Sequence, residues 1–457
     1  MPQNNHYDAI IIGSGQGGNP LAVKLAERGE KVALIESGHL GGTCINTGCT
    51  PTKTLVASAQ VAHYARNAGR WGVLAGSVSV DLPAILKRKD EIVQGMRSGW
   101  ERSMDGEGQP RLYRGRARFT GPKQLQVGDV ALEGERVFID TGSRPAIPKI
   151  DGLDSVPYLT NVSLLEMREL PQHLVVLGGG YVGLEFGQMF RRFGSEVTVI
   201  QSAERILPSE DEDITKELQR ALEAEGVRFR LRARAVKAEA RNGVVTVTVE
   251  GGEPVVGSHL LVATGRTPNT GDLDLQTAGV ETNERGYIVV NERLETSAAG
   301  VWAIGDVNGG PAFTHISYND FQIIYGNLYE GQNLSTKTRL VPYAVYTDPT
   351  LGRVGITEKA ARQSGKKLKV GKYPMSSVAR AKERAETAGL MKLVVDAETD
   401  NILGAAILSV EGGELVQILS TLMLAGKPYT LLKGAIYIHP TLAEGFFGLM
   451  DSVKPAE

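Results

Sequence analysis

The sequence predicts an α/β protein in which one strand–helix–strand unit occurs twice, followed by a separate α+β domain. Residues 9–36 and 174–201 share one pattern: an apolar β-branched run, a glycine-rich turn, an amphipathic helix ending at glycine, and a second apolar run. After about residue 338 the pattern changes to a hairpin over 389–409, with its turn at Asp400-Asn401, and an apolar helix over 414–425. The sequence therefore predicts repeated strand–helix–strand units before residue 338 and a domain with antiparallel strands after it.

The length of 457 residues is too great for one hydrophobic core and predicts about three domains. We expect a first domain over 1–150, a second over 151–270, a return to the first over 271–337 and a C-terminal domain over 338–457. Two matching segments, VFIDTGSRPA and LLVATGRTPN, mark the ends of the two repeated units, and RNGVVTVTVEG predicts antiparallel strands within the second.

The composition is that of a globular protein, with 42% hydrophobic and 22% charged residues and a formal net charge of −2. There is no basic stretch that would suggest nucleic acid, and no apolar run approaches the ~20 residues of a membrane span. The N-terminal segment lacks a basic leader and reaches a strand at once, so we expect no signal peptide and a cytoplasmic location.

Each repeated unit carries the pattern GxGxxG at its first turn. Its first glycine makes the tight turn, the second lets the backbone approach a pyrophosphate, and the third lets helix and strand pack closely. The helix then faces the phosphates with free N–H groups. Two copies in one register predict two Rossmann-like dinucleotide-binding domains. The glycines concerned are Gly13, Gly15 and Gly18 in the first copy and Gly178, Gly180 and Gly183 in the second.

The second strands of the two units end differently. Glu36 ends the first, where a carboxylate can accept hydrogen bonds from the ribose hydroxyls of an adenosine. Gln201 ends the second, and Arg205 follows it, so a 2′-phosphate is not repelled and can meet a cation. This pair favours NADPH over NADH at the second site; the alternative is that Gln201 and Arg205 are solvated loop residues.

The only two cysteines of the chain, Cys44 and Cys49, lie in one segment, GGTCINTGCTPTK, just after the first glycine-rich turn. Two thiols do not make a secreted disulfide framework, so a redox pair is predicted. Thr50 and Pro51 are typical of an N-cap and first helical residue, with the helix running to about Ala68. A helix N-terminus favours thiolate, so we expect a lowered thiol pKa.

Lys53 is predicted in the first turn of that helix, where a cation is unfavourable by ~0.3–1 kcal/mol. A local rule broken beside reactive groups suggests a function. Glu185 lies among apolar residues of the second unit, so an opposite charge is expected near it. The alternative is that Lys53 is solvated and that the Glu185 side chain reaches solvent.

Nearly the whole chain resembles the class I pyridine nucleotide–disulfide oxidoreductases, the group of dihydrolipoamide dehydrogenase, glutathione reductase and mercuric reductase. The resemblance rests, in order, on GSGQGG with Glu36, GGTCINTGCTPTK, GGGYVGLEFG, ATGRTPN, AIGDV and IHPTLAEG. The segments FTHISYNDF and ARAKERAETAGLMKL are similar to the mercuric-reductase-like branch, which includes the bacterial reactive-chlorine-resistance reductase.

The resemblance implies an FAD-dependent enzyme that passes electrons from NAD(P)H through FAD to a Cys44–Cys49 disulfide. Cys49 is then the sulfur nearer the flavin, and Cys44 is the outer thiol that attacks the substrate. His439 is the acid–base, and Glu444 holds its ring. It also implies a homodimer, with 338–457 as the interface and His439 reaching the active site of the partner subunit.

Cofactor contacts are likewise implied by the resemblance. Lys53 would lie near the flavin and pair with Glu185, and Tyr181 would cover the flavin until the nicotinamide displaces it. Asp306 would bind the ribityl chain or phosphates, or else be an ordinary turn aspartate. The FAD set is Gly13, Gly15, Gly18, Glu36, Gly42, Thr43, Lys53, Ala117, Thr141, Gly142, Asp306 and His315. The NAD(P) set is Gly178, Gly180, Tyr181, Gly183, Glu185, Gln201, Arg205 and Gly265. No resident metal site is predicted.

The electron acceptor stays open at this level. The chain ends GLMDSVKPAE without the cysteine pair of mercuric reductases and has no CxxC domain ahead of the core, so Hg(II) would lack a relay of soft ligands. Gln201 weakens an assignment as dihydrolipoamide dehydrogenase. A small disulfide, an oxidised sulfur or chlorine species, or a metal ion are the candidates. A diaphorase-like flavoprotein and a redox sensor are the other classes, although His439 with Glu444 favours turnover.

Overall fold

The computed structural model describes residues 5–456, and the chain divides into two compact units. The first unit comprises Met1–Thr54, Leu86–Ala146 and Gly265–Arg339, and the second comprises Leu55–Ile85, Ile147–Thr264 and Leu340–Glu457. Both units are α/β, and the predicted fold class is confirmed. The finer division of the chain into four segments stays a prediction.

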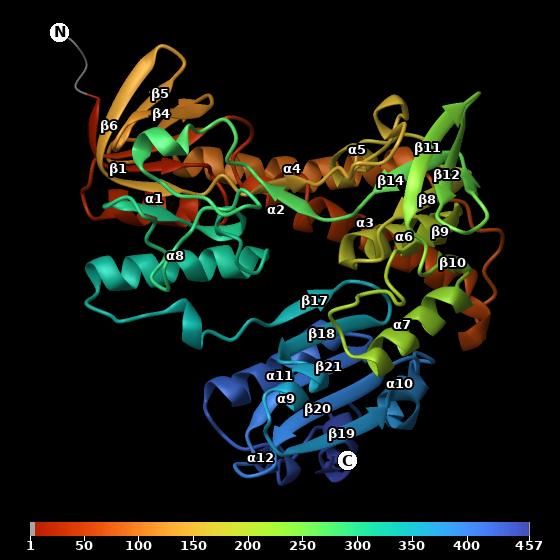
Figure 1. The fold of residues 1–457 in the computed structure, drawn as a ribbon. Helices are drawn as coiled ribbons and strands as arrows, with labels where there is room; N and C mark the ends of the chain where they lie inside the picture. Colours follow the sequence, from red (N-terminus) through yellow and green to blue (C-terminus); the bar gives the residue numbers. More distant parts are fainter. Residues whose placement is uncertain (1–4, 457) are drawn as a thin grey trace. The chain divides into compact units, whose positions relative to one another are not determined.

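The first unit is built on a mixed sheet in the order β3-β2-β1-β6-β5-β4, with β16 pairing β6. Figure 1 labels β1, β4, β5 and β6 of this sheet. Its strands β3, β2, β1, β6 and β16 pair in parallel. The apolar residues 9–12 of β1 and 32–35 of β2 are all buried, as is usual for parallel strands that are covered on both faces. A two-stranded ribbon of β7 and β15 follows the sheet. The bounds are β1 His6–Ile12, β2 Val32–Glu36, β3 Arg111–Arg114, β4 Ala117–Gly121, β5 Gln124–Val127, β6 Val130–Ile139, β7 Ser143–Pro145, β15 Arg266–Pro268 and β16 Val301–Ala303.

Two helices of this unit matter for the site, because both begin next to the sheet's carboxyl edge. Helix α1 spans Gly18–Glu27, and α8 spans Thr314–Tyr329. Their apolar faces share one core with β1 and β2, through Leu21 and Leu25 of α1 and Ile324 of α8. The remaining helices of the chain's first hundred residues are α2 Gly42–Asn46, α3 Cys49–Arg66 and α4 Leu82–Ser103.

The second unit contains a parallel sheet in the order β10-β9-β8-β14 and a small antiparallel sheet β11-β12-β13. The predicted antiparallel strands therefore form, and they join at Asn242-Gly243. The helices here are α5 Asn161–Leu164, α6 Tyr181–Phe193 and α7 Glu212–Ala224. The strands are β8 His173–Leu177, β9 Glu196–Ile200, β10 Val227–Arg230, β11 Ala235–Arg241, β12 Val244–Val249, β13 Val255–Gly257 and β14 His259–Val262.

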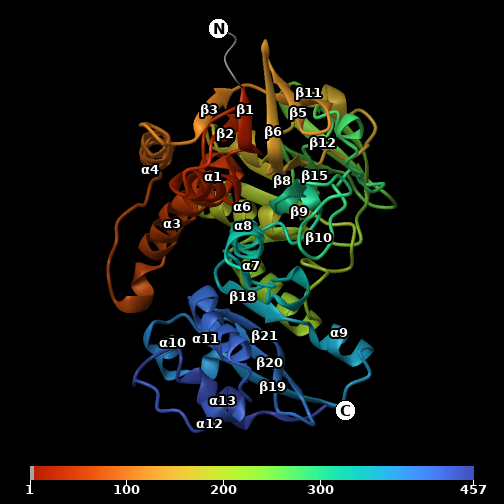
Figure 2. The ribbon, with the colours of Figure 1, turned by 90° about the vertical axis from the view of Figure 1, so that its left-hand side faces the viewer.

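The C-terminal part of this unit is an antiparallel sheet in the order β17-β18-β21-β20-β19-β22, with α11 packed on β18 and β21 (Figure 2). The predicted hairpin is β20 and β21, and Asp400 at its turn has a left-handed φ of 59°. The strands are β17 Tyr343–Val345, β18 Thr350–Gly355, β19 Leu368–Pro374, β20 Leu390–Asp396, β21 Ile402–Ser409 and β22 Lys454–Pro455. The helices are α9 Glu358–Gln363, α10 Ala379–Glu383, α11 Gly412–Leu424, α12 Thr430–Lys433 and α13 Gly445–Asp451.

Among the residues the structure describes, no helix combines the length and the apolar character needed to cross a membrane.

Candidate active site

The first glycine-rich turn leaves no room for side chains. Gly13 has φ +103°, and a Cβ there would lie 2.2 Å from the carbonyl oxygen of Asp140. A Cβ on Gly18 would lie 2.4 Å from the carbonyl oxygen of Gly13, and one on Gly15 would lie 2.4 Å from Oδ2 of Asp140. Only glycine fits these positions, so the backbone at the start of α1 is open to a pyrophosphate.

Asp140, at the end of β6, was not predicted as a site residue. Its Oδ2 accepts a hydrogen bond of 2.7 Å from the backbone N–H of Gly18, and the residue is 6% exposed. Burial raises the pKa of this carboxyl well above its usual range, and the nearby carboxylates of Asp306, Asp320 and Glu36 add to the rise, while the Gly18 bond opposes it. A neutral carboxyl here would not repel a pyrophosphate.

Glu36 ends β2 beside the same turn. Its Oε2 accepts from the backbone N–H and the hydroxyl of Ser14, at 2.9 and 2.6 Å, and its Oε1 accepts from the N–H of Gly38 at 2.7 Å. These bonds fix the carboxylate at the strand end, the place where such residues bind an adenosine ribose. The residues of the first turn therefore fit the adenosine diphosphate part of FAD.

The cysteine-bearing segment packs directly on this turn. Gly42 has φ +60°, and a Cβ there would lie 2.9 Å from the Cα of Gly15. The backbone N–H of Gly41 donates to the Ser14 carbonyl at 3.1 Å, and the Gln16 amide donates to the Gly41 carbonyl at 3.0 Å. The two motifs that the sequence places close together along the chain are thus in contact through backbone atoms.

Cys44 lies in α2 and Cys49 is the first residue of α3, and the two thiols interact with each other. Cys44 is partly buried and Cys49 is exposed. Helix α3 begins two residues earlier than predicted, so Thr50 lies inside its first turn and is not its N-cap. Oγ1 of Thr314, at the start of α8, lies 3.1 Å from Sγ of Cys49.

The predicted lowering of the thiol pKa is wrong for Cys44. Its pKa is raised, first because its thiol hydrogen bonds to Cys49 and then because it is partly buried. The hydroxyl of Thr314 and the charge of Lys53 oppose the rise without reversing it. A helix N-terminus alone does not decide the charge of a thiol that has a second sulfur beside it.

Three other residues of the predicted FAD set have partners within the first unit. Oδ2 of Asp306 accepts from the hydroxyl of Ser143 and lies 3.5 Å from Nε of Arg266. His315 stacks on Phe313, with ring centroids 5.4 Å apart. Thr141 exchanges hydrogen bonds with Asn269. Ala117 is buried in β4. Gly142 lies in the loop after β6, and Thr43 lies in α2. Their contacts with FAD stay predictions.

The second glycine-rich turn repeats the backbone of the first. Gly178 has φ +115°, and a Cβ there would lie 2.4 Å from the carbonyl oxygen of Ala263. A Cβ on Gly183 would lie 2.0 Å from the carbonyl oxygen of Gly178, whereas Gly180 has no atom within 4 Å of that position. Tyr181 begins α6 and is 37% exposed. The turn therefore fits a second dinucleotide.

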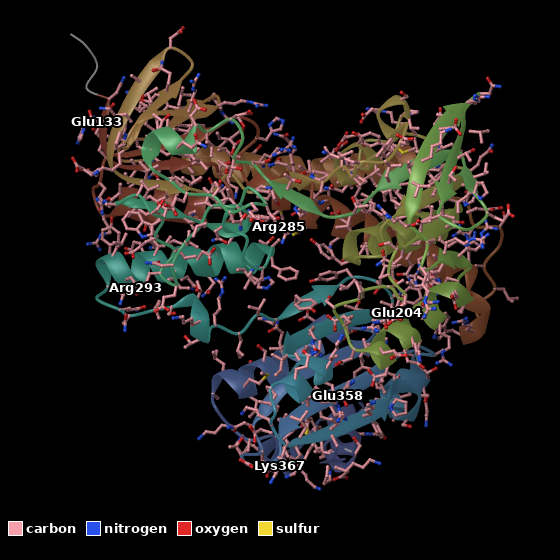
Figure 3. The ribbon with its side chains drawn as sticks, in the orientation of Figure 1. Glu133, Glu204, Arg285, Arg293, Glu358 and Lys367 are labelled. Carbon is pink, nitrogen blue, oxygen red and sulfur yellow. The ribbon has the colours of Figure 1, made fainter. Side chains whose placement is uncertain are left out.

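The loop after β9 brings two further charged residues, Glu204 and Arg232, close to Arg205. Figure 3 labels Glu204, whose carboxylate lies 3.2 Å from Arg205 and 3.5 Å from Arg232. Arg205 also donates to the carbonyl of Pro208 through one terminal nitrogen, whereas its Nε is buried without a hydrogen-bond partner. The backbone N–H of Arg232 donates to the Ala203 carbonyl at 2.9 Å, which brings the loop after β10 beside Gln201. Gly265, the next residue of the predicted NAD(P) set, belongs to the first unit and has φ +141°.

Helix α6 is fixed within the second unit by buried polar contacts. Glu185 is 4% exposed, and its Oε1 accepts from the backbone N–H of Tyr346 at 2.8 Å. Gln188, one turn further on, exchanges hydrogen bonds with the backbone of Asp348. The predicted pairing of Glu185 with Lys53, which belongs to the first unit, stays a prediction.

One cluster in the second unit has the composition of a metal site. The ligand atoms of His63, Glu225 and Asp348 lie within 4.8 Å of one another. The Arg192 guanidinium, however, forms ion pairs of 2.6 Å with both carboxylates. Burial and Arg192 lower the pKa of His63. Since the carboxylates are already neutralised, this cluster serves as a structural ion-pair network.

His439 and Glu444 form the predicted pair. Nδ1 of His439 lies 2.9 and 3.0 Å from the two carboxylate oxygens of Glu444, which also accepts from the backbone N–H of Thr441 at 3.0 Å. The Thr441 bond and then the His439 bond lower the pKa of Glu444. The carboxylate therefore selects the tautomer with a proton on Nδ1 and leaves Nε2 for chemistry. The His439 side chain is 71% exposed.

Comparison with known proteins agrees with this geometry. Residues 7–320 match the pyridine nucleotide-disulphide oxidoreductase family, and residues 341–448 match its dimerisation domain, which supports the predicted homodimer. The chain is 39% identical to the probable pyridine nucleotide-disulfide oxidoreductase RclA of Escherichia coli, covering 98% of this chain and all of that one. It is 36% identical to a mercuric reductase of Lysinibacillus sphaericus, covering 96% and 81%.

A solved structure is similar throughout. The Cu(II) complex of the HOCl-induced flavoprotein disulfide reductase RclA from Escherichia coli superposes with a TM-score of 0.90 at 38% identity, over 98% of this chain and 99% of that one. With its two dinucleotide turns, its paired thiols and its dimerisation domain, the chain belongs to the pyridine nucleotide–disulphide oxidoreductase family of FAD- and NAD(P)H-dependent flavoproteins.

Proposed function

We propose that this oxidoreductase uses Cys44 and Cys49 as its redox-active pair and reduces a small oxidised sulfur or chlorine species, a small disulfide or a metal ion such as Cu(II). The observation that carries the proposal is the contact between the thiol segment and the FAD turn, at Gly42 and Gly15. Relatives named for Cu(II) and for mercury support a metal ion among the candidates. We expect the cytoplasm as the location.

The protein's residues have distinct tasks in this scheme. Bound FAD would supply a two-electron carrier between the nicotinamide and the sulfurs, held by the first turn and Glu36. Cys44, whose pKa is raised, holds its proton and needs a base before it attacks an acceptor. His439 is suited to that task, because Glu444 fixes its ring with Nε2 outward.

Cysteine variants test the redox pair. We expect Cys44→Ser and Cys49→Ser to lower the rate with disulfides, hypothiocyanite, Cu(II) and Hg(II) by at least about 10³-fold, because no sulfur–sulfur bond can form. Reduction of a quinone dye should persist in both variants. The measurement is the anaerobic steady-state rate of NADPH oxidation with each acceptor. Full acceptor reduction by Cys44→Ser would instead indicate a diaphorase-like flavoprotein.

We further propose that His439 acts in the site of the partner subunit. His439→Gln should lower acceptor reduction by about 10²–10⁴-fold, the usual contribution of a general acid–base. His6→Gln is the matched control, because His6 forms a similar exposed pair with Glu135 at 3.0 Å. Mixed dimers of Cys44→Ser and His439→Gln chains should regain one working site if the histidine acts across the dimer, and none if it acts within its own chain.

We also propose a preference for NADPH, supported by the two arginines that flank Glu204 and by the neutral Gln201. Gln201→Glu should raise KM for NADPH by about tenfold, equivalent to ~1.4 kcal/mol, and change KM for NADH much less. Gln219→Glu on α7, where the Gln219 side chain is partly exposed, adds the same charge elsewhere and should change neither. Equal effects of Gln201→Glu on both nucleotides would contradict the preference.

A further inference from the structure

One hydroxyl that touches the sulfurs has no part in the scheme above. Thr314 is the first residue of α8, and its Oγ1 lies 3.1 Å from Sγ of Cys49. The same hydroxyl also favours the charged form of Cys44, but the neighbouring Cys49 and burial outweigh this effect and leave the pKa of Cys44 raised. It does not cap its own helix, since α8 has Phe313 at its N-cap and no side-chain cap bond. The Thr314 hydroxyl is therefore committed to sulfur rather than to the backbone.

The two thiols differ in where charge can reside. Cys44 is partly buried, and its contact with Cys49 disfavours its ionisation, whereas Cys49 is exposed. Cleavage of a Cys44–Cys49 bond by two electrons from NAD(P)H, with uptake of one proton, gives one thiol and one thiolate. The proton belongs on Cys44 and the charge on Cys49, and the Cys44 S–H can then donate to Cys49.

The surroundings of Cys49 match this distribution. Two long helices begin at this sulfur, since Cys49 is the first residue of α3 and Thr314 is the first residue of α8. Neither helix has an acidic residue in its first turn, so both present the partial positive charge of an uncompensated N-terminus. A hydroxyl aimed at the sulfur adds a donor whose hydrogen bond strengthens when the acceptor is charged.

We propose that Thr314 is a positioning residue of this reductase, whose hydroxyl donates to Sγ of Cys49 and holds the negative charge of the reduced pair on that sulfur. Cys44 is thereby kept as the protonated thiol that waits for an external base. The inference rests on the proposed role of the cysteine pair. It concerns Thr314 alone, which the sequence resemblance assigned no role.

The test uses the flavin-loaded protein with Cys44→Ser, in which Cys49 is the only thiol of the chain. The pH dependence of its alkylation by iodoacetamide, followed by peptide mass, reports the pKa of Cys49 directly and requires no turnover. Adding Thr314→Val should raise the midpoint by about one pH unit, the effect of losing one hydrogen bond to a charged group. Thr314→Ser should return the midpoint to within about 0.3 unit.

Thr50→Val is the matched control. Thr50 is adjacent to Cys49, but its hydroxyl donates to Sδ of Met96 at 3.5 Å, so its loss should leave the midpoint unchanged. Thr314→Ala, which adds no bulk, decides the outcome if the valine variant loses its flavin. An unchanged midpoint in the hydroxyl-free variants would overturn the proposal. Acceptor reduction by Cys44→Ser tests the redox role of the cysteine pair separately. Failure of the proposed function can therefore be distinguished from failure of the proposed role of Thr314.

Discussion

The two glycine-rich turns have the same backbone and different chemistry. In both, the first glycine has a left-handed φ, at Gly13 and Gly178, and faces a carbonyl oxygen at the end of the neighbouring strand. In the first turn that neighbouring residue is Asp140, and its carboxyl fills the space beside Gly15. In the second turn it is Ala263, and the space beside Gly180 is open.

The strand ends differ in the same sense. Glu36 is held by Ser14 and Gly38, whereas Gln201 has backbone bonds to Arg230 and Ala233. The polar groups of the first turn are thus held in place by contacts within the protein, which suits a cofactor that stays bound. The position beside Gly180 in the second turn has no protein atom near it, which suits a nucleotide that exchanges. Duplicated backbone geometry therefore leaves the binding mode to the side chains at the adjacent strand ends.

The largest expected effect comes from the first glycine of each turn. Gly13→Ala and Gly178→Ala place a Cβ within 2.2 and 2.4 Å of a backbone oxygen in a left-handed conformation, costing several kcal/mol each. Gly13→Ala should purify without flavin. Gly178→Ala should keep its flavin and raise KM for NADPH more than about tenfold. Flavin-to-protein absorbance and KM are the measurements.

Gly29→Ala is the control for the left-handed conformation by itself, because Gly29 has φ +86° and no atom within 4 Å of an added Cβ. It should lower stability by about 1–2 kcal/mol without loss of flavin. If Gly13→Ala retained as much flavin as the Gly29→Ala control, the close backbone contact at Gly13 would not be needed for flavin binding, and the prediction would be wrong.

A smaller effect separates the middle glycines. Gly15→Ala must displace the Asp140 carboxyl and should lower the free energy of unfolding by about 1–3 kcal/mol. Gly180→Ala meets no atom and should change it by less than about 0.5 kcal/mol. Urea denaturation of both variants makes the comparison. In a double-mutant cycle, Asp140→Ala should reduce the cost of Gly15→Ala, and strict additivity would show that the two residues do not compete for space.

The smallest effect is a pH dependence carried by Asp140. Its pKa is raised in the folded protein, so its stabilising contribution is complete below the unfolded value of about 3.9 and is lost as pH rises toward the folded value. Asp140→Asn cannot ionise and should gain in melting temperature relative to wild type as pH rises through this window. The neighbouring Asp306, Asp320 and Glu36 residues are the same in the variant and in wild type, so the comparison isolates the Asp140 carboxyl. Exposed Asp129→Asn is the control, and parallel pH curves for wild type and Asp140→Asn would contradict the prediction.

Much of the site could be predicted because its signals are local in the chain. The two GxGxxG turns, the cysteine pair and His439 with Glu444 each lie within a short segment, and the structure shows their local geometry. Asp140 differs in the sequence from the equivalent residue of the second repeat, Ala263. Only the structure shows that the Asp140 carboxyl is buried beside the first turn, which makes it a candidate site residue. Thr314 had none, because it is 265 residues from Cys49.

The sequence by itself determined the repeat, the family and the identity of the paired thiols, since backbone strain and residue spacing are properties of short segments. The tertiary structure decided how the charge is distributed. The raised pKa values of Cys44 and Asp140 depend on burial and on neighbours brought together from distant segments, and electrostatic energies follow distance in space rather than distance along the chain.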